Sequence, residues 1–193
     1  MAEKIELAET VMLIDAAFLN FVITDMKNNF ERMLGRTLQE VDVSLLMTYL
    51  ALDASLIHGE NEIQVLWVYD EQSSKLSFCQ PSVLKEELNG VAFMNLFGEF
   101  SFVSVSSEGM VSREELFLDL LNIVVDSTDV KKIIVISFNE EYGDKVQQAM
   151  NKVADKEMIQ FRMNEPATVV DYRWEMLAYP LMQALGIKGE ELQ

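Results

Sequence analysis

The sequence predicts a single-domain α/β fold, a three-layer α/β/α sandwich in which helices cover both faces of a mainly parallel five-stranded sheet. Four consecutive apolar residues end in an acid at Val11-Met-Leu-Ile-Asp15, which is typical of a strand buried on both faces at the centre of such a sheet. Segments with strand character then alternate with segments of helical periodicity, in the order β-α-α-β-α-β-α-β-α-β-α. At 193 residues, half of them hydrophobic, the chain can bury a substantial core.

Five segments have the composition of strands: 10–15, 62–70, 99–105, 131–138 and 158–163. The second resembles the first in running from apolar residues into an acid, Asp70. The third alternates apolar and polar residues and is expected nearer an edge, and residues 91–94 before it are left unassigned. Because nearly all of these strands are joined through helices, we expect most of them to be parallel.

Six segments are expected to be helical: 19–34, 41–57, 81–89, 112–126, 142–153 and 171–185. Gly35 is a plausible stop for the first of them. Ser112 fits the N-cap of the fourth, with Glu115 at the spacing of a capping box. Pro180 should kink or split the last helix. No repeat or linker divides the chain, so we expect one domain over 1–193, with a core over 10–163 and a C-terminal helical appendage over 164–193.

The charge of the chain argues against several partners. It has 15 Lys plus Arg against 32 Asp plus Glu, a net charge of −17, and no run of three basic residues. Such a field repels nucleic-acid backbones and anionic membranes. No apolar run approaches the roughly 20 residues of a membrane span. The polar N-terminus lacks the features of a signal peptide, and the one cysteine, Cys79, forms no internal disulfide, so we expect a soluble cytoplasmic protein.

The residue types exclude several chemistries and leave one open. The single histidine, His58, follows a helix at a turn, and the glycine-rich motifs of nucleotide-binding loops are missing. Acids remain at strand ends and helix starts: Asp15, Asp70, Glu114, Glu115, Asp119, Glu140 and Glu141. Across the carboxyl edge of the sheet several of them could converge and hold Mg²⁺ or Mn²⁺, which prefer oxygen ligands. The alternative is that they are ordinary solvated caps.

Four segments together resemble the NYN domains of the PIN-like ribonuclease superfamily over roughly residues 10–163. The first strand with Asp15 resembles the opening of an NYN domain, and the strand ending at Asp70 resembles its second strand. The segment 114–121 is similar to the helix that carries paired aspartates in that family. Residues 134–142 resemble its strand and acidic turn. The resemblance implies a PIN/Rossmann-like sheet with strand order 3-2-1-4-5, and metal ligands at Asp15, Asp119, Asn139 and Glu141.

The sequence departs from the NYN pattern where the acids should be densest. Arg113 stands where an aspartate is expected six residues before Asp119, and only Glu115, one helical turn away, could substitute for it. In the acidic turn, Asn139 replaces the first aspartate and Glu141 the second. A one-residue shift in the alignment would exchange Glu140 for Glu141, so which of the two faces the crevice stays open.

Two functions follow from this comparison. The first is a non-catalytic relative that acts as a protein-interaction or regulatory module, with an unknown protein partner or as a homodimer. The second is an Mg- or Mn-dependent ribonuclease that uses Asp15, Glu115 and Asp119 in catalysis, and whether the chain is an enzyme therefore stays open. A small-molecule binder at the edge of the sheet is a third hypothesis, resting on the fold alone. We place the non-catalytic function first because the net charge of −17 and the replacement of two expected acids by Arg113 and Asn139 both weigh against RNA cleavage.

Overall fold

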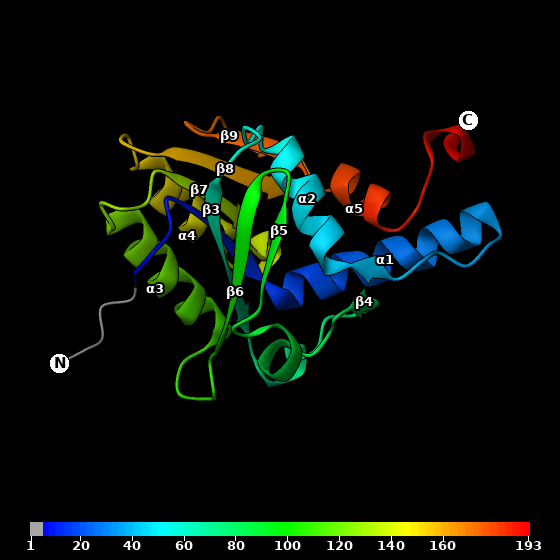
Figure 1. Ribbon diagram of the computed structural model, residues 1–193, viewed down its shortest axis with the longest axis horizontal. Coiled ribbons are helices and arrows are strands. Elements are labelled where there is room, and N and C mark those ends of the chain that lie inside the picture. The colour runs from blue at the N-terminus through cyan, green and yellow to red at the C-terminus, as the bar shows by residue number, and fades with distance from the viewer. Residues whose placement is uncertain (1–5) are drawn as a thin grey trace.

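The computed structural model describes residues 6–193 and contains one large, mostly parallel sheet (Figure 1). The sheet has seven strands in the order β5-β6-β3-β1-β7-β8-β9, and only β5 and β6 are antiparallel. The strands of this sheet are β1 (Thr10–Asp15), β3 (Asn61–Tyr69), β5 (Ala92–Asn95), β6 (Gly98–Ser106), β7 (Lys132–Ile136), β8 (Glu157–Arg162) and β9 (Arg173–Met176). A second sheet pairs β2 (Val41–Asp42) with β4 (Cys79–Gln80).

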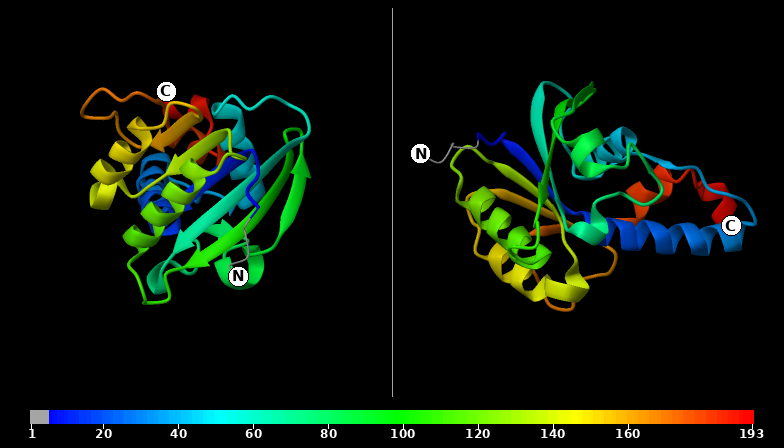
Figure 2. Two further views of the ribbon diagram at one scale, coloured as in Figure 1. Left: turned by 90° about the vertical axis from the view of Figure 1, so that its left-hand side faces the viewer. Right: turned by 90° about the horizontal axis from the view of Figure 1, so that it is seen from below.

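Helices lie on both faces of this sheet (Figure 2). The helices are α1 (Ala16–Leu34), α2 (Val43–Asp53), α3 (Arg113–Asp126), α4 (Asn139–Asn151) and α5 (Ala178–Ala184). Apolar side chains of α1, α2 and α5 form one core with one face of the strands. Those of α3 and α4 form a second core with the other face. No helix in the described part of the chain is long and apolar enough to cross a membrane.

The strand that organises the sheet is β1, as its sequence predicts. All six of its residues are buried, and it pairs in parallel with β3 on one side and with β7 on the other. Met12 and Ile14 point into the core beneath α1, whereas Val11 and Leu13 point into the core beneath α3 and α4. A strand with apolar residues on both faces can be buried only in this way.

The five predicted strands are present, and they lie beside one another in the expected order, observed as β6-β3-β1-β7-β8. Two predicted helix ends are also confirmed. Gly35 ends α1 in the left-handed conformation, and Ser112 caps α3 in a capping box with Glu115. The first five residues of the polar N-terminus lie outside the described residues.

The prediction of five strands is wrong, because two short edge strands extend the sheet to seven. The expected helix over 171–185 is instead β9, which pairs with β8, followed by the short helix α5. Pro180 is the third residue of α5, where the missing N–H of proline costs no helical hydrogen bond, so it does not kink a longer helix. The unassigned residues 91–94 supply most of β5, which folds back on β6.

The bounds of three further helices also differ from the prediction. The predicted second helix begins two residues later than expected, because Val41 and Asp42 pair with β4. The predicted third helix is a single turn, Leu84–Leu88, closed by a hydrogen bond from the Asn89 N–H to the Leu84 carbonyl. Helix α4 starts at Asn139 rather than at Tyr142, and its backbone is non-helical at Tyr142.

Candidate functional site

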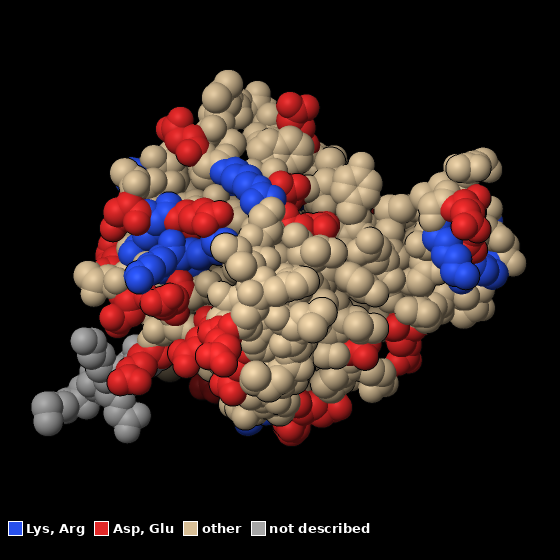
Figure 3. Space-filling view, turned by 45° about the horizontal axis from the view of Figure 1, so that its top comes forward, with Lys and Arg blue, Asp and Glu red and all other residues tan. Residues whose placement is uncertain are grey.

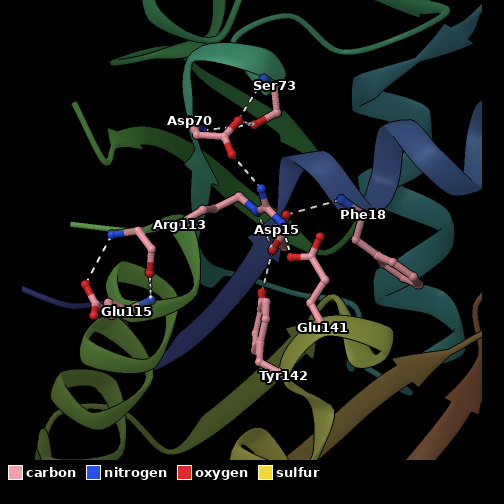
Figure 4. Close-up of polar contacts among 9 residues, drawn as sticks. Asp15, Phe18, Asp70, Ser73, Arg113, Glu115, Glu141 and Tyr142 are labelled. Carbon is pink, nitrogen blue, oxygen red and sulfur yellow. Dashed lines mark hydrogen bonds and ion pairs between the residues drawn. The ribbon is translucent and has the colours of Figure 1, made fainter. Parts of the chain in front are cut away.

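The candidate site lies at the carboxyl end of β1, where the chain turns from strand into helix α1. Asp15 is the last residue of β1 and is completely buried. One of its oxygens, Oδ1, accepts a hydrogen bond of 3.2 Å from the Phe18 N–H, so Asp15 also caps α1. The other oxygen, Oδ2, points away from α1 (Figure 4). A buried carboxylate needs a positive partner or several donors to remain charged.

Arg113 supplies that partner and joins three carboxylates from three parts of the fold (Figure 4). Its Nε is 3.0 Å from Asp15 Oδ2, its Nη1 is 2.5 Å from Asp70 Oδ2, and its Nη2 is 2.5 Å from Glu141 Oε2. Arg113 is the first residue of α3, Asp70 follows β3, and Glu141 lies in the first turn of α4. We refer to Asp15, Asp70, Arg113, Glu141 and Tyr142 as the Arg113 centre.

The Arg113 centre is largely closed to solvent on its inner side. The Arg113 side chain is 12% exposed, Asp15 is not exposed at all, and only Glu141, at 46%, is widely open to water. The guanidinium also lies 5.6 Å from the ring centre of Phe138, close enough for a cation–π interaction. The three carboxylates therefore meet one fixed positive charge in a partly desolvated position.

Tyr142 is the member of the Arg113 centre that contacts Asp15 from helix α4. Its hydroxyl donates a hydrogen bond to Asp15 Oδ2, the same oxygen that Arg113 contacts. Burial, together with the neighbouring Asp15 carboxylate, raises the pKa of Tyr142 well above its ordinary value. Tyr142 is therefore a hydrogen-bond donor at every ordinary pH, and both donors to Asp15 Oδ2 are permanent.

The charges within the centre stabilise one another. Burial alone would lower the pKa of Arg113, but the charge and hydrogen bonding of Asp15, together with Asp70 and Glu141, outweigh it and raise that pKa. Burial would likewise raise the pKa of Asp70, but hydrogen bonds from Ser73 and Arg113 outweigh it and hold that pKa below its ordinary value. Both partners therefore stay ionised around neutral pH.

A second polar network lies next to the centre, around Asn139. Its Oδ1 accepts hydrogen bonds from the Ser137 hydroxyl at 2.7 Å and from the Gln160 amide at 3.3 Å. Ser137 and Gln160 are completely buried, and the Gln160 carbonyl oxygen accepts in turn from Tyr172 and Arg162. Asn139 thus joins β7 to β8 through its side chain, and its oxygen is already used within the protein.

A family model covers almost the whole chain, matching residues 4–192, and its description is a family of unknown function, DUF6621. The chain belongs to the DUF6621 family. Searches of curated proteins and of solved structures found no match. For this DUF6621 member, then, the geometry of its own residues has to carry any argument about function.

The structure brings together only part of the site expected in this DUF6621 member. Asp15 and Glu141 do meet, and the structure shows that Glu141, rather than Glu140, contacts the centre. Glu115 does not reach Asp15, because its carboxylate accepts the Ser112 N–H in the capping box. Asp119 lies exposed on α3, two residues from the buried Phe117 and so on the opposite side of the helix. Asn139 is held by its own network.

The residue that organises the site was visible in the sequence, but in another role. In the sequence, Arg113 stands where the resemblance expects an aspartate, and Asp70 ends the strand that resembles the second NYN strand. The signal that could have found them is positional: both lie at the carboxyl edge of the sheet, one after β3 and one at the start of α3. A long side chain at that helix start can reach two strand ends and the first turn of α4, whereas the shorter side chain of an aspartate could not.

These residues do not fit the divalent metal that the resemblance implies. Among residues 6–193, no three His, Cys, Asp or Glu side chains are grouped so that they could hold a metal ion. The three carboxylates that do approach one another are bridged by the Arg113 guanidinium. Mg²⁺ would need oxygen ligands at roughly 2.0–2.1 Å in this space, and the guanidinium already fills it.

Proposed function

We propose that this protein is a diverged PIN/NYN-like domain that acts as a non-catalytic interaction or regulatory module. The observation that supports this proposal is the position of Arg113 among the acids at the carboxyl edge of β1 and β3. Metal-dependent cleavage of a phosphodiester uses bound cations to orient water and to offset the charge of the phosphate. In this protein the Arg113 side chain takes the place of such a cation, and a guanidinium has no coordination position at which to bind and activate water.

Arg113 is well suited to this structural role. A guanidinium is always charged and offers several N–H groups in a fixed plane, which matches carboxylates on different sides. Here its three nitrogens contact acids from β1, the end of β3 and α4. A metal would have to displace a largely buried cation from three ion pairs, and the displaced arginine would then lose its partners. The centre therefore stabilises the fold instead of recruiting a catalyst.

The surface charge supports the same proposal. Figure 3 shows that the Lys and Arg side chains on the face in view are bordered by Asp and Glu side chains. The net charge of −17 adds long-range repulsion of polyanions. An RNA-cleaving enzyme needs positive charge to hold the RNA backbone, so the electrostatics favour a protein partner.

The alternative is an Mg- or Mn-dependent ribonuclease, and one observation favours it. Asp15, Asp70 and Glu141 do converge at the edge where parallel sheets carry their active sites. For catalysis Arg113 would have to move out of the way. The third hypothesis, a small-molecule site, has less support, because the pocket beside Asn139 and Arg162 has a volume of about 200 Å³, below the roughly 300–1,000 Å³ of typical ligand sites.

An RNA-cleavage assay distinguishes the two functions. Short single-stranded and duplex RNAs are incubated with the wild type and with Asp15→Asn, each with Mg²⁺, with Mn²⁺ and with a chelator. We expect the wild type to cleave no faster than Asp15→Asn in any of these conditions. Cleavage that requires the metal and is lost in Asp15→Asn would overturn the proposal and establish the ribonuclease. A circular-dichroism spectrum of both proteins controls for folding.

A further inference from the structure

Strand β5 forms one edge of the large sheet, and none of its side chains is charged. Strand β5 pairs only with β6 in the described sheet. From Asn89 to Gly98 the chain has no ionisable side chain, although the protein carries 47 charged residues in all. Val91, Met94 and Leu96 of this stretch are 42%, 69% and 73% exposed. Charged side chains and proline are among the features that protect natural edge strands, and this edge has neither.

The opposite edge of the same sheet has the ordinary protection. Strand β9 carries Arg173 and Glu175, and these two side chains form an ion pair of 2.8 Å. Charged side chains of this kind discourage pairing with another chain. The contrast between the two edges makes β5 the place where another strand can add to the sheet.

The hydrogen bonds of β5 show which backbone groups face outward. At its start, Gly90 and Val91 form a glycine bulge opposite Phe102: the Gly90 N–H donates to the Phe102 carbonyl, and the Phe102 N–H donates to the Val91 carbonyl. Along two antiparallel strands, pairs of opposite residues alternate between hydrogen-bonded pairs and pairs without hydrogen bonds. Phe93 is therefore bonded to β6 through Phe100, and Asn95 through Gly98. Ala92 and Met94 point their N–H and C=O groups away from β6, toward the free edge.

We propose that β5 is a homodimer interface, at which a second copy of this chain adds its own β5 in antiparallel orientation. A twofold axis beside Phe93 places Ala92 of each copy opposite Met94 of the other. The two outward-facing residues of each copy then exchange four backbone hydrogen bonds, and none is left unpaired. The same axis places the two Phe93 rings next to each other, beside the existing stack of Phe93 on Phe100 at 4.9 Å. Such a pairing is isologous and closed.

Charge favours a second copy at this edge over other approaches of two such molecules. Two chains that each carry a net charge of −17 repel each other, so they associate most readily through surfaces on which acidic side chains are far apart. The nearest acid in the ladder is Glu99, on β6. In the proposed dimer the two β6 strands are separated by three strand spacings, about 14 Å. This distance exceeds the Debye length of about 8 Å at physiological salt, so the repulsion is screened.

This interface is independent of the Arg113 centre, since β6 and β3 lie between β5 and β1. The test begins with analytical ultracentrifugation of the full chain over a range of protein and salt concentrations. We expect a concentration-dependent species of twice the 22.0 kDa chain mass, and tighter association at higher salt as repulsion is screened. A mass of 22.0 kDa at every concentration and salt would overturn the proposal.

Two variants and a control localise the interface. Met94→Pro removes an outward N–H but none of the bonds to β6, and we expect it to weaken the dimer at least about tenfold. Met94→Val keeps the N–H and should retain the dimer. Met94→Lys is a second test that does not depend on proline, in case the proline variant fails to fold. It changes the net charge from −17 to −16. Overall repulsion is therefore slightly lower in this variant and cannot explain a weaker dimer. A dimer unchanged in Met94→Pro and Met94→Lys would overturn the assignment to β5.

Amide hydrogen exchange followed by NMR tests the register directly. The amides of Ala92 and Met94 should be protected in the dimer and exchange quickly in the diluted monomer, whereas those of Phe93 and Asn95 should be protected in both. Fast exchange of Ala92 and Met94 in the dimer would contradict the proposed register. If the protein is monomeric and a synthetic peptide of residues 91–96 protects these amides, the edge accepts other extended chains, and a second copy is not its partner.

Discussion

At the scale of single residues, Arg113 is the side chain on which the geometry of the candidate site depends. It holds the end of β1, the end of β3 and the start of α4 against the start of α3. Asp15 is completely buried, so without Arg113 it would keep only neutral donors, the Tyr142 hydroxyl and the Phe18 N–H. Removing one partner of a buried ion pair costs more than the pair contributes, because an unpaired charge stays behind.

We therefore expect Arg113→Gln to lower the free energy of unfolding by about 3–5 kcal/mol, measured by urea denaturation at neutral pH. Arg36→Gln is the matched control: Arg36 also contacts a carboxylate through two nitrogens, on Glu191, but with its side chain 37% exposed. For such a surface pair the expected cost is about 0–1 kcal/mol. Equal losses in the two variants would show that the Arg113 centre is an ordinary surface cluster.

Asp70 makes the stability of the centre depend on pH. Its pKa in the folded protein lies below its ordinary value of 3.8. Its stabilising contribution is therefore complete above that ordinary value and is lost as the pH falls through the lower, folded-state pKa. In urea titrations at successive pH values, the wild type should be more stable than Asp70→Asn at neutral pH, and the gap should close in acid.

A matched variant shows whether this closing gap belongs to Asp70. Asp25 is exposed on α1 and forms no ion pair among the described residues. The stability difference between the wild type and Asp25→Asn should stay small throughout the pH range. A gap for Asp70→Asn that is constant or grows in acid would mean that its carboxylate is not stabilised by Ser73 and Arg113.

The sequence could predict which acids matter only where the backbone alone decides the position. Asp15 follows directly from the end of a buried central strand. The turn that holds Glu140 and Glu141 follows from the start of a helix after another strand, but only the structure shows that Glu141 is the one that contacts Arg113. Arg113 could not be placed as the centre, because its role depends on how far a long side chain reaches between elements. Asp119 comes from the resemblance, which assigns a residue type to a position, and in this structure that position faces solvent.

At the scale of elements, the hairpin of β5 and β6 depends on Gly98. Its φ angle is +137°, a conformation that side chains rarely adopt. A Cβ built at Gly98 would lie 2.0 Å from the carbonyl oxygen of Asn61, on the neighbouring strand β3. This close approach lets β6 begin its pairing with β3 directly after the turn. Only glycine satisfies both conditions.

Gly98→Ala should therefore destabilise the protein by at least about 3 kcal/mol in urea denaturation. Gly189→Ala is the control, since nothing lies within 4 Å of its added Cβ and its φ is ordinary. That variant should stay within about 0.5 kcal/mol of the wild type. A Gly98→Ala protein as stable as the control would show that the contact between β6 and β3 near Asn61 is looser than the structure has it.

The two strands missed in the sequence are short edge strands, for a physical reason. A buried central strand such as β1 has apolar residues on both faces, which is a strong signal. Edge strands are half-exposed and mix residue types: β9 has the sequence Arg-Trp-Glu-Met, and all four residues are of intermediate burial. Its strand conformation comes from pairing with β8, a tertiary contact that local composition does not encode.

At the scale of the whole molecule, the chain combines a well-determined α/β core with a strongly negative charge. The alternation of strands and helices was sufficient to predict the core and its mainly parallel sheet, whereas the order of the five inner strands was expected from the resemblance to NYN domains. The function could not be predicted in the same way, because proteins with this architecture have many unrelated functions. The proposed function depends on one feature of the site: Arg113 occupies the place that a metal cation would take among the acids.

The most direct test of that claim is a thermal melt with and without millimolar Mn²⁺, on the wild type, Arg113→Ala, Asp15→Asn and the double variant. Removing Arg113 frees three carboxylates, so Arg113→Ala should gain an Mn²⁺-dependent shift. At about 100 times the dissociation constant this stabilisation is roughly 2.7 kcal/mol, or about 5–10 °C. The wild type, Asp15→Asn and the double variant should show no shift. A shift in the wild type that disappears in Asp15→Asn would contradict the account.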